Sequence, residues 1–371
     1  MMAIPVADPG ASYRRFAEEI DAAVLSVLRR GWYILGSECE GFERAFANYC
    51  GVAHAVGVAN GTDAVELALR ALGVGHGDKV VTVANTAVAT VAAIERIGAY
   101  PVFVDVDPVS QTLSPEALHD CLRKDGAGAK AVVAVHLFGS PCAMQPILEI
   151  AGRRGAHVIE DCAQAHGADV LGRRVGSWGA VGAFSFYPTK NLGAFGDGGA
   201  IVTNDPELAK RVRMLRQYGW QRRYVSDVVG VNSRLDEIQA AVLTVKLKAL
   251  DGDNARRRAI AERYRSRLQT LPVVLPGDPL DGRHVYHQFV MQCGECRDEL
   301  EQHLRRHEIG TAILYPVPIH RQPAYHARFA GLSLPVTENL SRSILSLPIY
   351  PELTDEAVDI VAEAVNRFYV K

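Results

Sequence analysis

Residues 129–161 read AKAVVAVHLFGSPCAMQPILEIAGRRGAHVIED, in which two apolar runs enclose a stretch with helical spacing. We predict strands at residues 129–137 and 156–160, because a strand buried on both faces is apolar at successive positions. Between them, the apolar side chains of residues 144–154 predict a helix. A strand, a helix and a second strand in this order are typical of two parallel strands joined by a crossover helix.

The same alternation continues on both sides of this stretch. Its repetition predicts an α/β fold, with a mostly parallel sheet that helices cover on both faces. Towards the N-terminus, helices are expected at 62–72, 86–97 and 115–124 and strands at 79–84 and 100–106; towards the C-terminus, strands are expected at 180–187 and 200–203.

The two ends of the chain carry other patterns. Residues 12–30 have helical spacing and end at Gly31, so we predict a helix there. A long helical stretch is expected at 235–268, and residues 271–282, with three prolines and two glycines, read as a boundary region. Beyond it we expect strands at 284–293 and 311–314 and helices at 297–307 and 355–369. We therefore divide the chain into an N-terminal helical segment (1–30), a large domain (31–245) and a smaller α+β C-terminal domain (246–371).

Composition excludes several classes of function. The chain has 371 residues, 48% of them hydrophobic, and its 40 basic and 42 acidic residues leave no basic excess for nucleic-acid binding. The longest apolar run, 131–138, is too short to cross a membrane, and residues 1–15 show no secretory signal. Seven scattered cysteines do not form a disulfide framework, so we expect a cytoplasmic protein with reduced thiols.

Neither a metal site nor a dinucleotide site is predicted. Cys293 and Cys296 form a single CxxC pair without a second one, and His303 and His307 enclose two arginines that would repel a cation. No G-x-G-x-x-G follows a predicted strand and no P-loop is present, which argues against a nicotinamide-dependent oxidoreductase.

In a parallel sheet, functional groups gather at the carboxyl ends of strands and in the loops beyond them, and two candidate site stretches are of this kind. Asn60-Gly61-Thr62-Asp63 opens a helix, whose free N–H groups suit a phosphate, although an ordinary helix cap has the same residues. Asp161 follows the strand at 156–160, where its carboxylate either faces a cationic nitrogen or caps the next turn.

Two further stretches follow. Residues 185–199, SFYPTKNLGAFGDGG, place Lys190 after a buried strand and before a glycine-rich turn. Burial would lower the pKa of Lys190 and make it a better nucleophile, and this composite of Ser, Lys and Gly favours a functional lysine over a surface one. Residues 230–241, GVNSRLDEIQAA, open the long helical stretch with the capping residues Asn232 and Ser233 and with Arg234.

Together these stretches, with YPVPIH at 315–320 and LPIYPEL at 347–353, resemble the DegT/DnrJ/StrS sugar aminotransferases. The matches cover nearly the whole chain in the expected order, and residues 185–199 are the most specific. The resemblance implies an aspartate aminotransferase-like, fold-type I transferase that depends on pyridoxal 5′-phosphate (PLP). It also implies a transaminase of amino sugar biosynthesis, which passes the amino group of glutamate to a nucleotide-linked keto-deoxyhexose.

The resemblance also assigns roles to residues. Lys190 would bind PLP as a Schiff base and then move the proton, Asp161 would pair with the pyridinium nitrogen, and Gln164 would contact the region of the ring's 3-oxygen. An asparagine from the neighbouring subunit completes the phosphate site in this family, which implies a homodimer with shared active sites. The phosphate is expected to contact Gly61, Thr62, Ser185 and the neighbouring subunit's copy of Asn232.

Further side chains fall in stretches that the family uses for substrate. Either they contact the sugar nucleotide or they belong to the core or an interface, and Arg234 either reaches a pyrophosphate or pairs with Asp236. The expected substrate-binding residues are Tyr33, Arg234, His287, Tyr315 and His320, and Trp32 lies beside the first of them.

One stretch departs from the family pattern. The family commonly has an aromatic residue after the first threonine of Thr86-Ala87-Val88-Ala89-Thr90, stacked on the PLP ring, and Ala87 cannot stack. This departure favours amination at C-3 over C-4 of the hexose. Two alternatives stay open, a regulatory non-catalytic member and a deoxygenating relative. The presence of Asp161, Ser185 and Lys190 argues against the first, and Lys190, where deoxygenating relatives have histidine, argues against the second.

Overall fold

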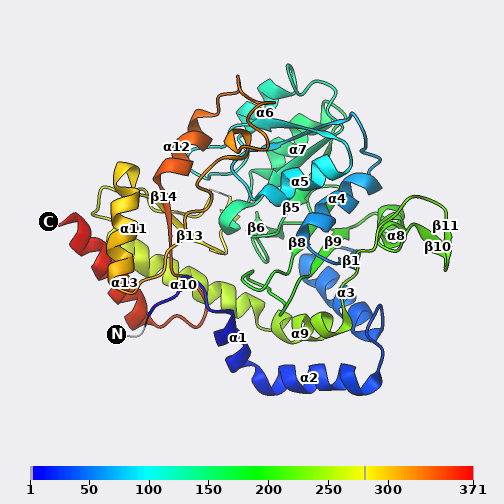
Figure 1. Cartoon of the computed structure of the whole chain (residues 1–371), viewed down its shortest axis with the longest axis horizontal. Coiled ribbons are helices and arrows are strands. Elements are labelled where there is room, and N and C mark those ends of the chain that lie inside the picture. The colour runs from blue at the N-terminus through cyan, green and yellow to red at the C-terminus, as the bar shows by residue number, and fades with distance from the viewer. Residues whose placement is uncertain (1–2, 280, 371) are drawn as a thin grey trace.

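A seven-stranded sheet forms the centre of the computed structural model, which describes residues 3–279 and 281–370 (Figure 1). The strand order is β1-β9-β8-β5-β4-β2-β3. Strands β3, β2, β4, β5 and β8 are parallel, while β9 runs antiparallel to both β8 and β1, so the prediction of a mostly parallel sheet is confirmed. The strands are β1 (His54–Val58), β2 (Lys79–Val83), β3 (Tyr100–Val104), β4 (Ala131–Val135), β5 (His157–Asp161), β8 (Val181–Ser185) and β9 (Gly199–Thr203).

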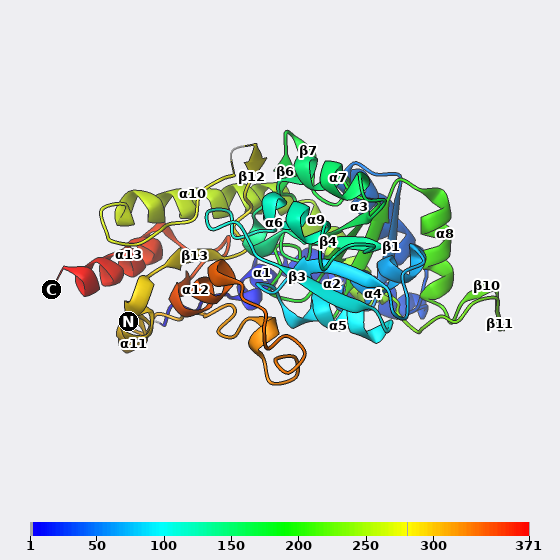
Figure 2. The ribbon, with the colours of Figure 1, turned by 90° about the horizontal axis from the view of Figure 1, so that it is seen from above.

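Helices cover both faces of this sheet, as predicted from the apolar strands. Figure 2 shows α6 and α7 on one side of the sheet and α5 on the other. Strand β4 is buried at each of its five residues, because helices pack on both of its faces. The covering helices are α3 (Ser37–Cys50), α4 (Gly61–Ala71), α5 (Val88–Arg96), α6 (Pro115–Cys121), α7 (Met144–Gly152) and α8 (Pro206–Leu215). Helices α3 and α8 were not predicted.

Two stretches predicted as single helices are each divided. The first consists of α1 (Pro9–Arg15) and α2 (Ala17–Arg30), because Phe16 between them leaves helical geometry with φ −118° and ψ 23°. The left-handed Gly31 (φ 70°) ends α2, as expected of a glycine after a helix. The second consists of α9 (Glu237–Leu247) and α10 (Leu250–Leu268).

The C-terminal part is a smaller α+β unit. Its two strands, β13 (Phe289–Gln292) and β14 (Ile344–Leu347), are antiparallel and pack with α11 (Arg297–Arg306) and α13 (Asp355–Tyr369). Helix α12 (Pro335–Ser343) packs through Leu340 in the same core as Val290 and Ile344. The strand predicted at 284–293 is shorter, and the one predicted at 311–314 is reduced to a single bridge between Ala312 and Ser346. Strand β14 and helix α12 were not predicted. The division of the chain at residues 30 and 245 stays a prediction.

Small elements complete the molecule. Strands β6 (Asp169–Val170), β7 (Arg173–Arg174) and β12 (Gly282–Arg283) form one small sheet, and β10 (Trp220–Arg222) with β11 (Val225–Ser226) forms a hairpin that projects beyond α8 (Figure 1). Within the described part of the chain, no helix is long and apolar enough to cross a membrane. The seven cysteines are unpaired.

The sheet brings distant stretches of sequence to one edge. Parallel strands end on the same side, and β1 is parallel to β8 because β9 is antiparallel to both. The carboxyl ends of β1, β2, β5 and β8 therefore meet. Asp161 and Ser185 are the last residues of β5 and β8, and Asn60 and Thr86 lie in the loops after β1 and β2.

Candidate active site

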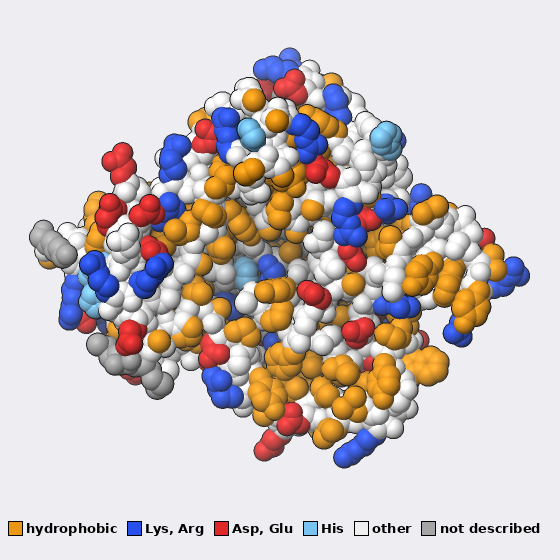
Figure 3. Space-filling model, viewed as in Figure 1, with side chains coloured by type: hydrophobic (Ala, Val, Ile, Leu, Met, Phe, Trp, Pro, Cys, Tyr) orange, Lys and Arg blue, Asp and Glu red, His pale blue; other side chains and the backbone are white. Residues whose placement is uncertain are grey.

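A cavity of about 240 Å³ lies at this edge of the sheet. Figure 3 shows the molecular surface hollowed near the middle of this face, with histidine and basic side chains at the floor of the hollow. The cavity brings together residues that are far apart in the sequence but were predicted to share one site. Its wall includes Gly61, Thr62, Asp161, Gln164, Ser185 and Lys190.

Lys190 lies in the loop that follows β8, and its side chain is only partly exposed. A turn holds it there, with its backbone N–H donating to the carbonyl of Tyr187 at 2.8 Å. Burial lowers the pKa of Lys190 from 10.5 to about 8, although the negative charge of Asp161 opposes part of this shift. More of this amine is therefore unprotonated near neutral pH than of an ordinary surface lysine.

Two donors hold the buried carboxylate of Asp161 at the end of β5. Thr90 Oγ1 donates to its Oδ2 at 2.8 Å, and the Ala163 backbone N–H donates to its Oδ1 at 3.2 Å. Thr86 Oγ1 lies 3.2 Å from Thr90 Oγ1. Because the single hydroxyl proton of Thr90 is directed to Asp161, Thr86 must be the donor in that second contact.

The threonines at 86 and 90 therefore support Asp161, a role that we did not predict from the sequence. Both side chains are buried, and Thr90 lies in the first turn of α5. Their spacing of four residues was the available signal, because residues four apart lie on the same face of a helix.

Gln164 links two other loops to the cavity. Its Oε1 accepts from the backbone N–H of Phe138 at 2.7 Å, and its Nε2 donates to the hydroxyl of Tyr315 at 3.0 Å. Burial raises the pKa of Tyr315 to about 12; the Gln164 hydrogen bond works against this rise and the charge of Asp161 adds to it. Tyr315 is therefore a neutral phenol that reaches the site through Gln164.

The first turn of α4 forms an anion cradle. Asn60 caps the helix, its Oδ1 accepting from the backbone N–H of Asp63 at 2.8 Å. At Gly61, a Cβ atom would lie 2.6 Å from the Cβ of Ser185, so only glycine lets the Ser185 side chain approach the helix start. Unpaired helix N–H groups and the helix dipole favour a negative charge at this place.

The carboxylate of Asp63 is held away from this cradle. Arg96 Nη1 donates to its Oδ1 at 2.9 Å and Ser233 Oγ donates to its Oδ2 at 2.7 Å. Ser233 also accepts from the backbone N–H of Ala59 at 3.0 Å. These partners satisfy the negative charge of Asp63, which would otherwise oppose an anion at the helix start.

Ala87 lines the cavity at the start of α5, as the sequence suggested it would. The neighbouring Val88 is 45% exposed. Among the described residues that form the cavity wall, Tyr187 is the aromatic one. The position at which the family commonly has an aromatic side chain is therefore open here.

Six of the expected substrate or cofactor residues lie outside this cavity wall: Tyr315, which contacts Gln164, two histidines, and Tyr33, Asn232 and Arg234. Tyr33 is 47% exposed, with its hydroxyl 3.3 Å from the Leu28 carbonyl oxygen. Asn232 is exposed and forms a backbone bridge with Gln217. Arg234 is half-buried in the segment before α9.

The two predicted histidines are buried and also lie outside the cavity wall. His287 Nδ1 is 3.2 Å from Oδ1 of Asn191, the residue that follows Lys190. Burial, and to a smaller extent the positive charges of Lys190 and Arg257, lower the pKa of His287 well below its usual value. His320 Nε2 is 3.0 Å from Glu338 Oε1. Neither histidine ring lines the cavity.

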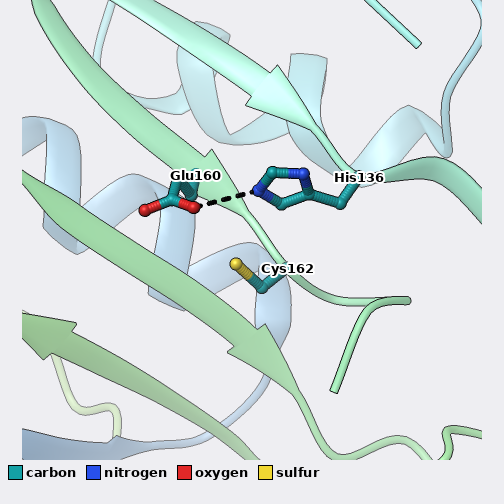
Figure 4. Close-up of side chains that lie close together, drawn as sticks. All are labelled: His136, Glu160 and Cys162. Carbon is teal, nitrogen blue, oxygen red and sulfur yellow. Dashed lines mark hydrogen bonds and ion pairs between the residues drawn. The ribbon is translucent and has the colours of Figure 1, made fainter. Parts of the chain in front are cut away.

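His136, Glu160 and Cys162 form a buried cluster (Figure 4), in which Glu160 and Cys162 are the sequence neighbours of Asp161. His136 Nδ1 accepts from the backbone N–H of Cys142 at 2.9 Å, so its proton is on Nε2, which donates to Glu160 Oε2 at 3.1 Å. His136 keeps no free lone pair for a cation. Glu160 also accepts from the backbone N–H groups of Gly176, Trp178 and Gly179.

Comparison with known proteins agrees with this geometry. The model of the DegT/DnrJ/EryC1/StrS aminotransferase family matches residues 14–366. The chain is 47% identical to dTDP-3-amino-3,4,6-trideoxy-alpha-D-glucose transaminase of Streptomyces venezuelae, over 98% of this chain and 96% of the relative. It is 46% identical to dTDP-3-amino-3,6-dideoxy-alpha-D-galactopyranose transaminase of Aneurinibacillus thermoaerophilus, over 98% of this chain and 99% of the relative.

A solved structure extends the comparison to the whole fold. The crystal structure of S. venezuelae DesV in complex with a ketimine intermediate matches with a TM-score of 0.96 and 46% identity, and the match covers 100% of each chain.

Proposed function

The chain belongs to the DegT/DnrJ/EryC1/StrS aminotransferase family, whose aminotransferases use PLP, and on this premise we propose its reaction. We propose that it transfers the amino group of glutamate to C-3 of a nucleotide-linked keto-deoxyhexose. The names of the two relatives support C-3, because both describe 3-amino sugars on dTDP although their hexoses differ. Amination at C-4 is the competing position.

The observation that carries the proposal is the pair formed by a low-pKa lysine and a buried, hydrogen-bonded aspartate on one cavity. The site fits the cofactor: the glycine at 61 leaves room at a helix start for its phosphate, and Asp161 offers a carboxylate for its ring nitrogen. When bound, PLP supplies an electron sink for negative charge at the substrate carbon.

The side chains would then have distinct tasks. Lys190 would hold the cofactor through its amine and would take and return the proton at the reacting carbon, for which its pKa of about 8 is suited. Asp161, held by Thr90 and Ala163, would keep the ring nitrogen protonated. Gln164, whose amide group is held by Phe138 and Tyr315, would contact the region of the ring's 3-oxygen.

We further propose a homodimer in which Asn232 completes the phosphate site of the partner. The exposed position of Asn232, outside its own chain's cavity, supports this assignment. An apolar surface on and after α2 also supports it, and Figure 3 shows hydrophobic side chains gathered there. Its exposed members are Leu25, Leu28, Trp32, Tyr33 and Ile34. The seven unpaired cysteines support a reducing compartment, the cytoplasm.

The test is the visible absorption spectrum of the purified protein with PLP, before and after glutamate is added. We expect a band of lysine-bound PLP, which glutamate converts to a pyridoxamine phosphate band. We also expect that dTDP-3-keto sugars reverse this conversion faster than 4-keto sugars do. The Lys190→Ala variant is the control and should keep its fold but lose the band. A protein whose band glutamate leaves unchanged would contradict the proposal.

The second candidate function is a regulatory protein without catalysis. Ala87 favours this candidate, because alanine has no aromatic ring that could stack on the cofactor and help to retain it. A protein that binds no PLP in the same spectrum would support this candidate.

A further inference from the structure

A second, small cavity adjoins the first, and Lys190 lines both. Its volume is about 40 Å³. The start of α1, the loop around Lys190, the end of α9, the first turns of α10 and residues 350–352 form its walls. Its charged side chains besides Lys190 are Asp8, Lys246, Asp253, Arg257 and Glu352.

The three carboxylates on this wall already have partners. Arg14 Nη2 lies 2.8 Å from Asp8 Oδ2. Arg15 holds the other two, with Nη2 at 2.7 Å from Asp253 Oδ1 and Nη1 at 3.3 Å from Glu352 Oε1. Both arginines come from α1 and neither is a wall residue of the cavity.

The two basic side chains are buried without such partners. Lys246 is 8% exposed and Arg257 is 6% exposed, and no carboxylate oxygen of residues 3–279 and 281–370 lies within 4.0 Å of either one. Lys246 Nζ donates to the backbone carbonyl of Gly193 at 2.5 Å. Arg257 Nη1 donates to two backbone carbonyls, and its buried Nε has no hydrogen-bond partner.

The pKa values of Lys246 and Arg257 are those of buried cations without an anionic partner. Burial lowers the pKa of Lys246 to about 8 and that of Arg257 to about 10, although the charges of Glu352 and Asp253 counter part of each shift. A buried cation is stabilised by an anion that forms hydrogen bonds with it. The cavity therefore suits a negatively charged group.

We propose that this cavity binds a carboxylate group of the amino donor, with Lys246 and Arg257 as its partners. The inference rests on the proposed function, in which glutamate is the donor and brings two carboxylates to the site. About 40 Å³ is enough for a carboxylate head, because a cavity of about 10–15 Å³ on this measure already admits one water molecule. The ammonium and the guanidinium both offer charge-assisted hydrogen bonds to such a group.

The two half-reactions test this assignment separately. The donor half-reaction is followed as the spectral change that glutamate causes in the PLP-loaded enzyme, and the acceptor half-reaction as its reversal by the ketosugar. Lys246→Met should raise the half-saturating glutamate concentration by roughly 10- to 100-fold, the range for one hydrogen bond to a charged group, and leave that of the ketosugar unchanged. Lys246→Arg, which keeps the charge, should restore most of the affinity.

A matched control is available two residues further along. Lys248 is exposed and outside the cavity, so Lys248→Met should change neither half-reaction. Glutarate, which has both carboxylates but no amine, should inhibit the donor half-reaction of the wild-type enzyme competitively and inhibit Lys246→Met at proportionally higher concentration.

The outcomes separate this inference from the proposed function. Equal losses in both half-reactions would overturn the carboxylate site, because they would show that Lys246 only supports the loop around Lys190 through Gly193. Unchanged glutamate saturation in Lys246→Met would overturn it too, as would a failure of glutarate to inhibit the donor half-reaction of the wild type. A wild-type enzyme whose spectrum does not respond to glutamate would refute the proposed function instead.

Discussion

Replacing Thr90 by valine removes one hydroxyl from the support of Asp161 and leaves the shape of the side chain almost unchanged. The carboxylate loses its 2.8 Å donor and keeps the longer 3.2 Å bond from Ala163 as its remaining protein donor. In the protein without cofactor, water in the cavity replaces the lost donor. PLP must then displace that water, so the lost hydrogen bond weakens the binding of PLP.

A hydrogen bond to a charged group is worth about 1.5–3 kcal/mol, which corresponds to a roughly 10- to 100-fold weaker affinity for PLP. Thr90→Ser retains the hydroxyl and should bind PLP within about threefold of the wild type. Thr86→Val should have a smaller effect, about two- to tenfold, because Thr86 reaches Asp161 only through Thr90.

The assay is a titration of the apoprotein with PLP, followed by absorbance, together with a thermal melt. Thr82→Val is the matched control, because Thr82 is buried and donates to the Val133 carbonyl at 3.1 Å but does not line the cavity. It should lower the melting temperature and leave the affinity for PLP unchanged. Wild-type affinity in Thr90→Val would refute the assigned support, as would an equal loss of affinity in the Thr82 control.

Three more predictions concern the same site. The rate at which the apoprotein takes up PLP should rise with pH with a midpoint near 8, because only unprotonated Lys190 attacks and burial lowers its pKa to about 8; a midpoint near 10, that of an ordinary lysine, would contradict this. Gly61→Ala should weaken PLP binding roughly tenfold or more, since its Cβ would lie 2.6 Å from that of Ser185, whereas Gly75→Ala, with no atom within 4 Å, should not. Co-expressed Lys190→Ala and Asn232→Ala chains should regain about a quarter of wild-type activity, because half of the dimers are mixed and each mixed dimer has one intact site; activity no higher than the mean of the two parent variants would argue against shared sites.

Patterns that depend on neighbouring residues were readable from the sequence. The apolar runs predicted the five parallel strands within a few residues, and the helix at 355–369 has the predicted bounds. Strand ends also indicated where Asp161 and Lys190 would lie, because the carboxyl ends of parallel strands meet at one edge. The division of helices could not be predicted. The apolar spacing continues through Phe16, whereas the backbone leaves helical geometry there.

Contacts between distant residues were decided by the order of the strands. Thr90 and Asp161 are 71 positions apart and meet because the parallel strands β2 and β5 end at the same edge of the sheet with only β4 between them, so that α5, which follows β2, begins near the end of β5. His287 is buried against Asn191 and outside the cavity wall, and its contact with the substrate stays a prediction. The residue type alone does not indicate whether the ring of a histidine faces a ligand or the core.

By itself, the sequence determined which groups are present: a lysine after a buried strand, an aspartate at a strand end and a glycine at a helix start. These follow from local periodicity and residue chemistry. Only the tertiary structure decided which charges have partners. Arg15 takes the carboxylates of Asp253 and Glu352, while Lys246 and Arg257 stay buried without one, because burial and pairing depend on atoms that approach each other only when the chain has folded.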